Sequence, residues 1–136
     1  AVAKERQSRN DDAAVKNIQW VHSEAESTGL PTGSADLQTA CFTFHELPDV
    51  AAREIIKEMY RVCKVGGTVA FTDNNPKSKV IQSLPAPIFT LMKSTEPWSD
   101  EYYAFDLKRA LEEAGFSNVE SYNSDPRHRT VVAMKS

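Results

Sequence analysis

A chain of 136 residues has room for one domain of ordinary size. Its composition, 40% hydrophobic and 26% charged, is that of a globular protein, and no apolar run is long enough to span a bilayer. The formal net charge of -3 leaves no broad basic field for a nucleic-acid backbone, because the one dense basic cluster is residues 127–129. We therefore expect a soluble domain that neither binds nucleic acid nor spans a membrane.

The two cysteines, Cys41 and Cys63, fall inside predicted regular elements. A disulfide framework or a zinc site usually has its cysteines in loops, with paired spacing. We expect neither here, and we place the protein in a reducing intracellular compartment, the cytoplasm or an organelle. The charged stretch at residues 1–17 also differs from a signal peptide.

The first third of the chain predicts two strands. Residues 1–9 have the pattern of the end of a helix, and a polar break follows them. Residues 18–23 alternate as a short strand before a loop rich in turn formers. Residues 36–44 predict the second strand, and their almost wholly apolar second half is typical of a buried strand.

The period changes to that of a helix at Pro48. Apolar side chains then recur at the spacing of one helix face, at Ala52, Ile55, Ile56, Met59 and Cys63. Gly66 or Gly67 can adopt the left-handed conformation that ends a helix, so we expect the helix to stop there. Residues 68–73 predict a strand, and a helix followed by a strand favours a parallel α/β sheet.

The last third predicts one more helix and two strands. An apolar stripe at residues 107–114 ends at Gly115. Residues 118–124 and 128–135 then alternate as strands. The link between them is too short for a crossover, so we expect an antiparallel pair at the end of the sheet.

Candidate functional residues follow the predicted parallel strands. Residues 23–26 come after the first strand, residues 41–46 end the second, and residues 73–75 come after the third. Open α/β sheets bind their ligands at the carboxyl ends of the strands. We therefore expect these residues on one rim of the sheet.

Three stretches of the chain carry a family resemblance. They are HSEAESTGLPTGSADLQTACFTFHELPD (residues 22–49), EMYRVCKVGGTVAFTDNNP (residues 58–76) and LEEAGFSNVE (residues 111–120). In this order and spacing they resemble the class I S-adenosylmethionine-dependent methyltransferases, in the small-molecule branch. The family's pattern has a strand ending in an acidic residue and Ala, a Leu-Pro loop, a strand ending near His, and a helix leading to two glycines.

The resemblance implies a Rossmann-like methyltransferase sheet, with parallel strands and a C-terminal antiparallel strand pair. The family's glycine-rich loop follows its first strand, and this chain resembles the family only from the helix after the second. We therefore expect an N-terminally truncated fold, with residues 1–136 forming a partial methyltransferase domain. We expect it to bind the cofactor poorly alone and to offer open sheet edges to a second copy or a partner chain.

The resemblance also implies the cofactor, S-adenosylmethionine, and residues that bind it. Glu24 and Ala25 match the family's acidic-Ala pair, whose carboxylate accepts a hydrogen bond from the adenine amino group. Ala40, Cys41 and Phe42 match the strand that passes the methionine portion of the cofactor. The alternatives are a solvated turn carboxylate at Glu24 and ordinary strand packing at the other three.

His45 is the candidate catalytic residue, because a histidine at this rim could accept a proton from a substrate oxygen or nitrogen. It could also orient the loop, or cap the helix together with Glu46. Related O-methyltransferases place an Asp-Asn pair for magnesium where Asp73 and Asn74 stand. The matching aspartate at the second strand end is missing, so we predict no metal site.

Residues 77–98 form a connection that is long and apolar for a loop. In the family the corresponding region covers the substrate pocket, and a lipophilic or aromatic acceptor would fit, although packing of a short helix would fit too. We predict S-adenosylmethionine-dependent methyl transfer to a small molecule, for a parent enzyme of which this chain is part.

Two alternatives from other classes stay open. A non-catalytic α/β module would complete its sheet with a partner chain, and a nicotinamide dehydrogenase fragment would respond to NAD. Tyr60 and Lys64 have the Tyr-x-x-x-Lys spacing of short-chain dehydrogenases. No serine stands near the end of the preceding predicted strand to complete that catalytic set.

Overall fold

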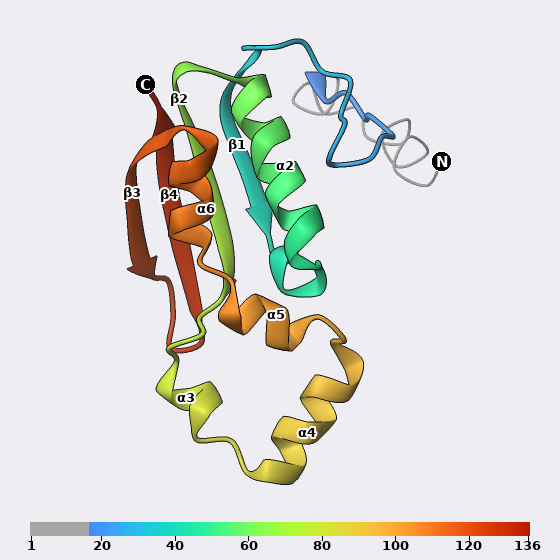
Figure 1. Ribbon diagram of the computed structural model, residues 1–136, viewed down its shortest axis with the longest axis vertical. Helices are drawn as coiled ribbons and strands as arrows, with labels where there is room; N and C mark the ends of the chain where they lie inside the picture. Colours follow the sequence, from blue (N-terminus) through green and yellow to red (C-terminus); the bar gives the residue numbers. More distant parts are fainter. Residues whose placement is uncertain (1–16) are drawn as a thin grey trace.

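Four strands form one mixed sheet in the part of the chain that the structure describes, in the order β1-β2-β4-β3. This structure is a computed structural model that describes residues 17–136, without the side chains of residues 92, 93 and 95. The strands are β1 (Ala35–Cys41), β2 (Cys63–Asn74), β3 (Phe116–Asn123) and β4 (His128–Lys135). β1 and β2 are parallel, and β4 is antiparallel to both β2 and β3. The predicted sheet with its closing antiparallel pair is confirmed (Figure 1).

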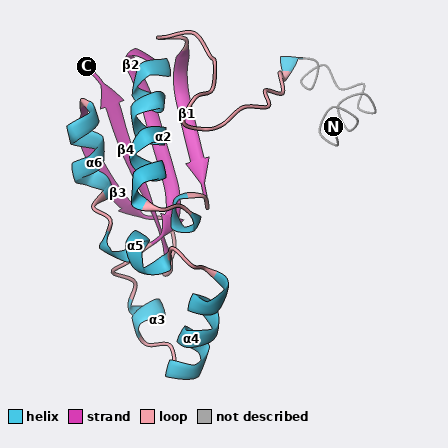
Figure 2. Ribbon diagram, turned by 45° about the vertical axis from the view of Figure 1, so that its right-hand side comes forward, coloured by secondary structure: helices cyan, strands magenta, loops and turns pink. Residues whose placement is uncertain are grey.

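Two helices cover one face of the sheet. α2 (Asp49–Val62) lies over β1 and β2, and α6 (Leu107–Ala114) lies over β3 and β4 (Figure 2). The helices α3 (Lys79–Gln82), α4 (Ala86–Thr95) and α5 (Ser99–Ala104) lie beyond the carboxyl ends of β1 and β2, as Figure 1 shows. The rim on which the candidate residues were expected therefore faces this helical segment.

The core lies between the two covering helices and the sheet. The predicted stripe of α2 is buried from Ala52 to Met59, and Cys63 is buried as the first residue of β2. These side chains pack with Val69 and Phe71 of β2 and with the buried face of α6. Leu111 of α6 is 0% exposed.

The end of α2 differs from the prediction. The helix ends at Val62, and Cys63 is already extended, so neither Gly66 nor Gly67 caps it. The β1–β2 register jumps between two pairs, Ala35↔Cys63 and Leu37↔Thr68, so residues 64–67 bulge out of the ladder. Gly66 has a φ of 79°, and a Cβ on Gly67 would lie 2.8 Å from the Cys63 Sγ. Both glycines therefore serve the bulge, whereas Gly115, with a φ of 107°, does end its helix as predicted.

The predicted strand at residues 18–23 is wrong. In the described part of the chain this segment joins no strand, and the nearest ladder feature is an isolated bridge between Glu24 and Ser27. Its apolar side chains Ile18, Trp20 and Val21 are exposed. Alternation of apolar and polar residues gives a local preference for extended backbone, but a strand forms only when it can pair with the edge of a neighbouring strand. The predicted helix end at residues 1–9 lies outside the described residues.

An ion pair on α2 holds the segment that precedes β1. The carboxylate of Glu58 accepts hydrogen bonds from the backbone N–H and the hydroxyl of Thr28, at 2.9 and 2.6 Å. Arg61 donates two hydrogen bonds of 2.7 Å to the same carboxylate, and it also reaches Thr32 and the Leu30 carbonyl. The Arg61 guanidinium and Thr28 lower the pKa of Glu58 from 4.5 to about 2. We call this group the Glu58–Arg61 clamp.

Truncating Leu111 to alanine should destabilise the fold by about 2 to 5 kcal/mol, because it leaves a cavity between α6 and the sheet. The matched control is Leu37→Ala on β1, where the side chain is 61% exposed. This change should cost about 0.5 kcal/mol. Urea unfolding followed by circular dichroism measures both, and equal losses would contradict the core described above.

The clamp predicts an acid-sensitive contribution to stability. A carboxyl whose pKa is lowered on folding stabilises the fold above its unfolded value, and this stabilisation is lost as the pH falls toward the folded value. The urea midpoint of the wild type should therefore exceed that of Glu58→Gln at pH 6, and this difference in midpoint should shrink as the pH falls from 4.5 toward about 2. Glu54→Gln, which removes the exposed pair with Lys57, should show little gap at any pH. A gap for Glu58→Gln that is independent of pH would disprove the role of its charge.

Candidate functional site

β1 ends in a turn made by a residue with left-handed backbone geometry. Phe42 has a φ of 53°, which costs a residue with a Cβ about 1 kcal/mol or more. Its N–H still donates to the Thr72 carbonyl at 2.8 Å, and its ring meets the ring of His128 edge-on at 5.1 Å. Phe42 is 51% exposed. The strand therefore ends at Cys41 rather than at the predicted residue 44, and the chain turns into the 3₁₀ helix η2 (Phe44–Glu46).

The buried carboxylate of Asp73, at the end of β2, organises this turn. Asp73 is 4% exposed. Its Oδ2 accepts hydrogen bonds from the backbone N–H groups of Phe44 and His45, at 2.8 and 3.3 Å. Its Oδ1 accepts from the N–H of Asn74 at 2.8 Å. One side chain therefore connects the ends of β1 and β2.

His45 contacts the same carboxylate with its ring. The Nδ1 of His45 lies 2.6 Å from the Asp73 Oδ1. An ionised carboxylate only accepts hydrogen bonds, so we assign the proton to Nδ1, which leaves the Nε2 lone pair available. The His45 side chain is 12% exposed, and its Nε2 lies 3.8 Å from the exposed carboxylate of Glu46. The arrangement can remove a proton at Nε2, while Asp73 orients the ring and stabilises the resulting cation.

Tyr102 of α5 completes the surroundings of His45. The two rings are edge-on with centroids 6.3 Å apart, and the Tyr102 hydroxyl donates to the Asn74 carbonyl. Tyr102 is 3% exposed, and burial followed by the charge of Asp73 raises its pKa, so the hydroxyl remains a neutral donor. Sequence reasoning missed Tyr102, because its place depends on the docking of α5 against the rim.

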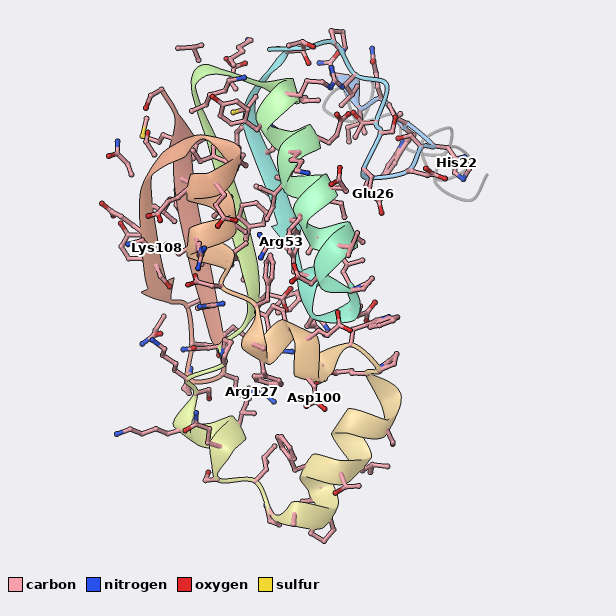
Figure 3. The ribbon with its side chains drawn as sticks, viewed as in Figure 1. His22, Glu26, Arg53, Asp100, Lys108 and Arg127 are labelled. Atoms are coloured by element: carbon pink, nitrogen blue, oxygen red, sulfur yellow. The ribbon has the colours of Figure 1, made fainter. Side chains whose placement is uncertain are left out.

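The structure brings together only part of the predicted site. Cys41, Phe42 and His45 lie at the rim, Cys41 is exposed, and Ala40 packs against the core. Glu24 and Ala25 lie in the exposed segment beside α2. Figure 3 shows their neighbour Glu26 well away from Asp100 on α5. The adenine contact assigned to Glu24 and Ala25 therefore stays a prediction.

The geometry also bears on a metal site and on the Tyr-x-x-x-Lys spacing of Tyr60 and Lys64. Within residues 17–136, no three His, Cys, Asp or Glu side chains converge as a metal site requires. Tyr60 packs edge-on against Phe116 at 5.1 Å, whereas Lys64 pairs with Asp36 at 2.8 Å. The side chains of Tyr60 and Lys64 therefore serve separate structural contacts.

An apolar cavity adjoins the rim at the helical segment. Its volume is about 460 Å³, and it is lined by Pro76, Ile81, Gln82, Leu84, Ala86, Phe89 and Tyr103. The apolar segment at residues 77–98 supplies most of this lining, and α5 supplies Tyr103. A cavity of this size and polarity is suited to a small organic molecule. None of the helices in residues 17–136 has the length and apolarity needed to cross a bilayer.

Known proteins of similar sequence are methyltransferases. Residues 1–91 match the model of the ubiE/COQ5 methyltransferase family. The demethylmenaquinone methyltransferase of Staphylococcus aureus is 28% identical over 124 residues, which cover 79% of this chain and 51% of that protein. The chain thus spans about half the length of the curated relatives that it matches.

Solved structures share the fold at lower identity. A SAM-dependent methyltransferase from Aquifex aeolicus superposes with a TM-score of 0.65 and 22% identity, over 98% of this chain and 61% of that chain. Human N-acetylserotonin methyltransferase, in complex with SAM, gives a TM-score of 0.65 and 17% identity, over 96% of this chain and 36% of that chain. The Rossmann-like methyltransferase fold is confirmed. Since the family model matches more than half of its residues, this chain belongs to the ubiE/COQ5 methyltransferase family.

Proposed function

We propose that this chain supplies the strand-end part of a site for S-adenosylmethionine-dependent methyl transfer to a small molecule. The observation that carries the proposal is the contact of 2.6 Å between His45 and Asp73, beside the exposed end of β1. A histidine oriented by a buried carboxylate is suited to proton removal. Membership of a methyltransferase family supports the same assignment.

The end of β1 fits the methionine portion of the cofactor. Cys41 is exposed, and Phe42 presents a half-exposed ring, whose face attracts a cation such as a sulfonium. When bound, S-adenosylmethionine would supply the electrophilic methyl group. Ala40, Cys41 and Phe42 are the residues we assign to its methionine portion.

His45 would act as the general base toward the methyl acceptor. Its Nε2 would take a proton from the acceptor's oxygen, nitrogen or carbon, while Asp73 holds the ring through Nδ1. Tyr102 would keep the Asp73-Asn74 turn in place through the Asn74 carbonyl. Alignment of the acceptor with the methyl group would supply the rest of the rate enhancement.

The acceptor would lie in the apolar cavity of about 460 Å³, which suits a lipophilic or aromatic molecule.

A second candidate function rests on the sheet edge. Among the described residues no strand pairs with the outer edge of β1, where Leu37 is 61% exposed. A non-catalytic module could complete its sheet there with another chain.

Cofactor binding can be tested at Cys41, because Cys63 is buried and serves as an internal control. S-adenosylmethionine should slow the alkylation of Cys41 by N-ethylmaleimide, about tenfold when its concentration is ten times Kd. Alkylation is quantified by peptide mass spectrometry, and NAD should have no effect. Protection by NAD alone would support the dehydrogenase alternative. A stable dimer or complex without protection by either ligand would support the non-catalytic module.

The same assay decides the role of Glu24. If its carboxylate binds the adenine amino group, Glu24→Gln should weaken protection by S-adenosylmethionine by about tenfold in concentration. The matched control is Glu26→Gln, two residues away in the same exposed segment. Equal effects of the two variants would argue against a specific contact at Glu24.

Replacing His45 by glutamine should lower turnover by about 10² to 10⁴, because the general base is lost. Formation of S-adenosylhomocysteine is measured with a panel of phenols, hydroquinones and naphthols as acceptors. Protection of Cys41 by S-adenosylmethionine should be retained, which separates loss of the base from loss of the cofactor site. His22→Gln, an exposed histidine of the segment before β1, is the control. Unchanged turnover in His45→Gln would overturn its assignment.

A further inference from the structure

A second cavity lies between α5, the start of α6 and the β3–β4 hairpin. Its volume is about 250 Å³, and its lining includes Tyr103, Lys108 and Arg129. Figure 3 shows Lys108 on α6, next to the sheet. Pro76 and Tyr103 line both this cavity and the apolar cavity of about 460 Å³, so the two share a wall.

Arg129 lines the smaller cavity without a carboxylate partner. None of the ion pairs within residues 17–136 involves Arg129. Its Nε is buried, and among the described residues it has no hydrogen-bond partner. Arg129 is half-buried and its side chain also interacts with the Tyr102 hydroxyl, so only the Nε–H lacks a partner within residues 17–136. A buried donor that is left unsatisfied is costly, so this atom calls for an anionic or polar ligand.

Tyr103 adds a second unsatisfied donor to the same cavity. Its hydroxyl is buried and has no hydrogen-bond partner among the described residues. Burial raises the pKa of Tyr103, so the hydroxyl keeps its proton and can donate it. The neighbouring tyrosine differs, because the Tyr102 hydroxyl is already bonded to the Asn74 carbonyl.

The charges around the cavity favour a singly charged, planar anion. Arg129, Lys77 and Lys108 are cationic, but Asp106 and Glu120 also line the cavity. The side chains of Asp106 and Glu120 would repel a dianionic phosphate ligand more strongly than they would repel a singly charged carboxylate ligand. A carboxylate also matches the planar guanidinium fork of an arginine.

We propose that the methyl acceptor is an aromatic carboxylic acid, whose carboxylate binds Arg129 and the Tyr103 hydroxyl while its ring lies in the adjoining apolar cavity. This inference rests on the proposed function and adds the substrate class. Arg129 and Tyr103 would select the acceptor by its charge. A hydroxyl group on its ring would take the methyl group, its proton would pass to the His45 Nε2, and S-adenosylhomocysteine would leave.

The test compares two probes of the same shape on the whole chain, 2-naphthoate and the neutral 2-naphthamide. Binding is followed by NMR chemical shifts of the backbone amides around Tyr103 and Arg129. The wild type should bind 2-naphthoate about 10- to 100-fold more tightly than 2-naphthamide, because a hydrogen bond to a charged group contributes this much. Arg129→Gln should abolish the preference, and Tyr103→Phe should reduce it.

Two further variants separate recognition from folding and from general charge. Arg129→Lys keeps the positive charge and should retain part of the preference, and thermal unfolding verifies that each variant is folded. Arg127→Gln removes an exposed arginine between β3 and β4 that does not line the cavity, and it should leave the preference for 2-naphthoate unchanged. Equal affinities of the two probes for the wild type, or equal losses in Arg127→Gln and Arg129→Gln, would overturn the proposal.

Failure of the carboxylate proposal can be distinguished from failure of the proposed methyl transfer. A preference for 2-naphthoate that depends on Arg129 would support the carboxylate site even if S-adenosylmethionine failed to protect Cys41. Protection of Cys41 without any preference for 2-naphthoate would overturn only the substrate class. Tighter binding of inorganic phosphate than of 2-naphthoate at the same residues would also overturn it.

Discussion

The rim of this domain depends on one buried carboxylate. Asp73 accepts three backbone hydrogen bonds and holds the His45 ring, so it ties the end of β1 to the end of β2. A buried carboxylate without these partners would be costly. The left-handed turn at Phe42 and the short η2 helix are therefore parts of the same arrangement, since they bring the N–H groups of η2 to Asp73.

Helix α5 connects this rim to the two cavities. Two neighbouring side chains of the helix have different tasks, because Tyr102 packs by His45 while Tyr103 lines both cavities. In the proposed function, a shift of α5 would change proton removal and acceptor binding together. The Glu58–Arg61 clamp acts at a separate place, where it holds the segment before β1 against α2.

The parts of the fold that follow from local patterns could be predicted. The helical stripe at residues 52–59 is buried in α2, and Gly115 ends α6 in the left-handed conformation. A short link dictates the antiparallel β3–β4 pair. The strand expected at residues 18–23 fails, because alternation gives a preference for extended backbone and cannot supply the neighbouring edge that a strand needs.

By itself, the sequence determined the α/β class, the order of the four strands with helices α2 and α6, the family resemblance and the position of His45 at a strand end, because periodicity and motif order are properties of neighbouring residues. Only the tertiary structure decided that Asp73 holds His45 and that Tyr102 packs beside it. It also decided that Arg129 shares a cavity with Tyr103. These contacts join residues that are distant in the chain, His45 and Asp73 being 28 positions apart, and they arise only when the strands and the helical segment pack together.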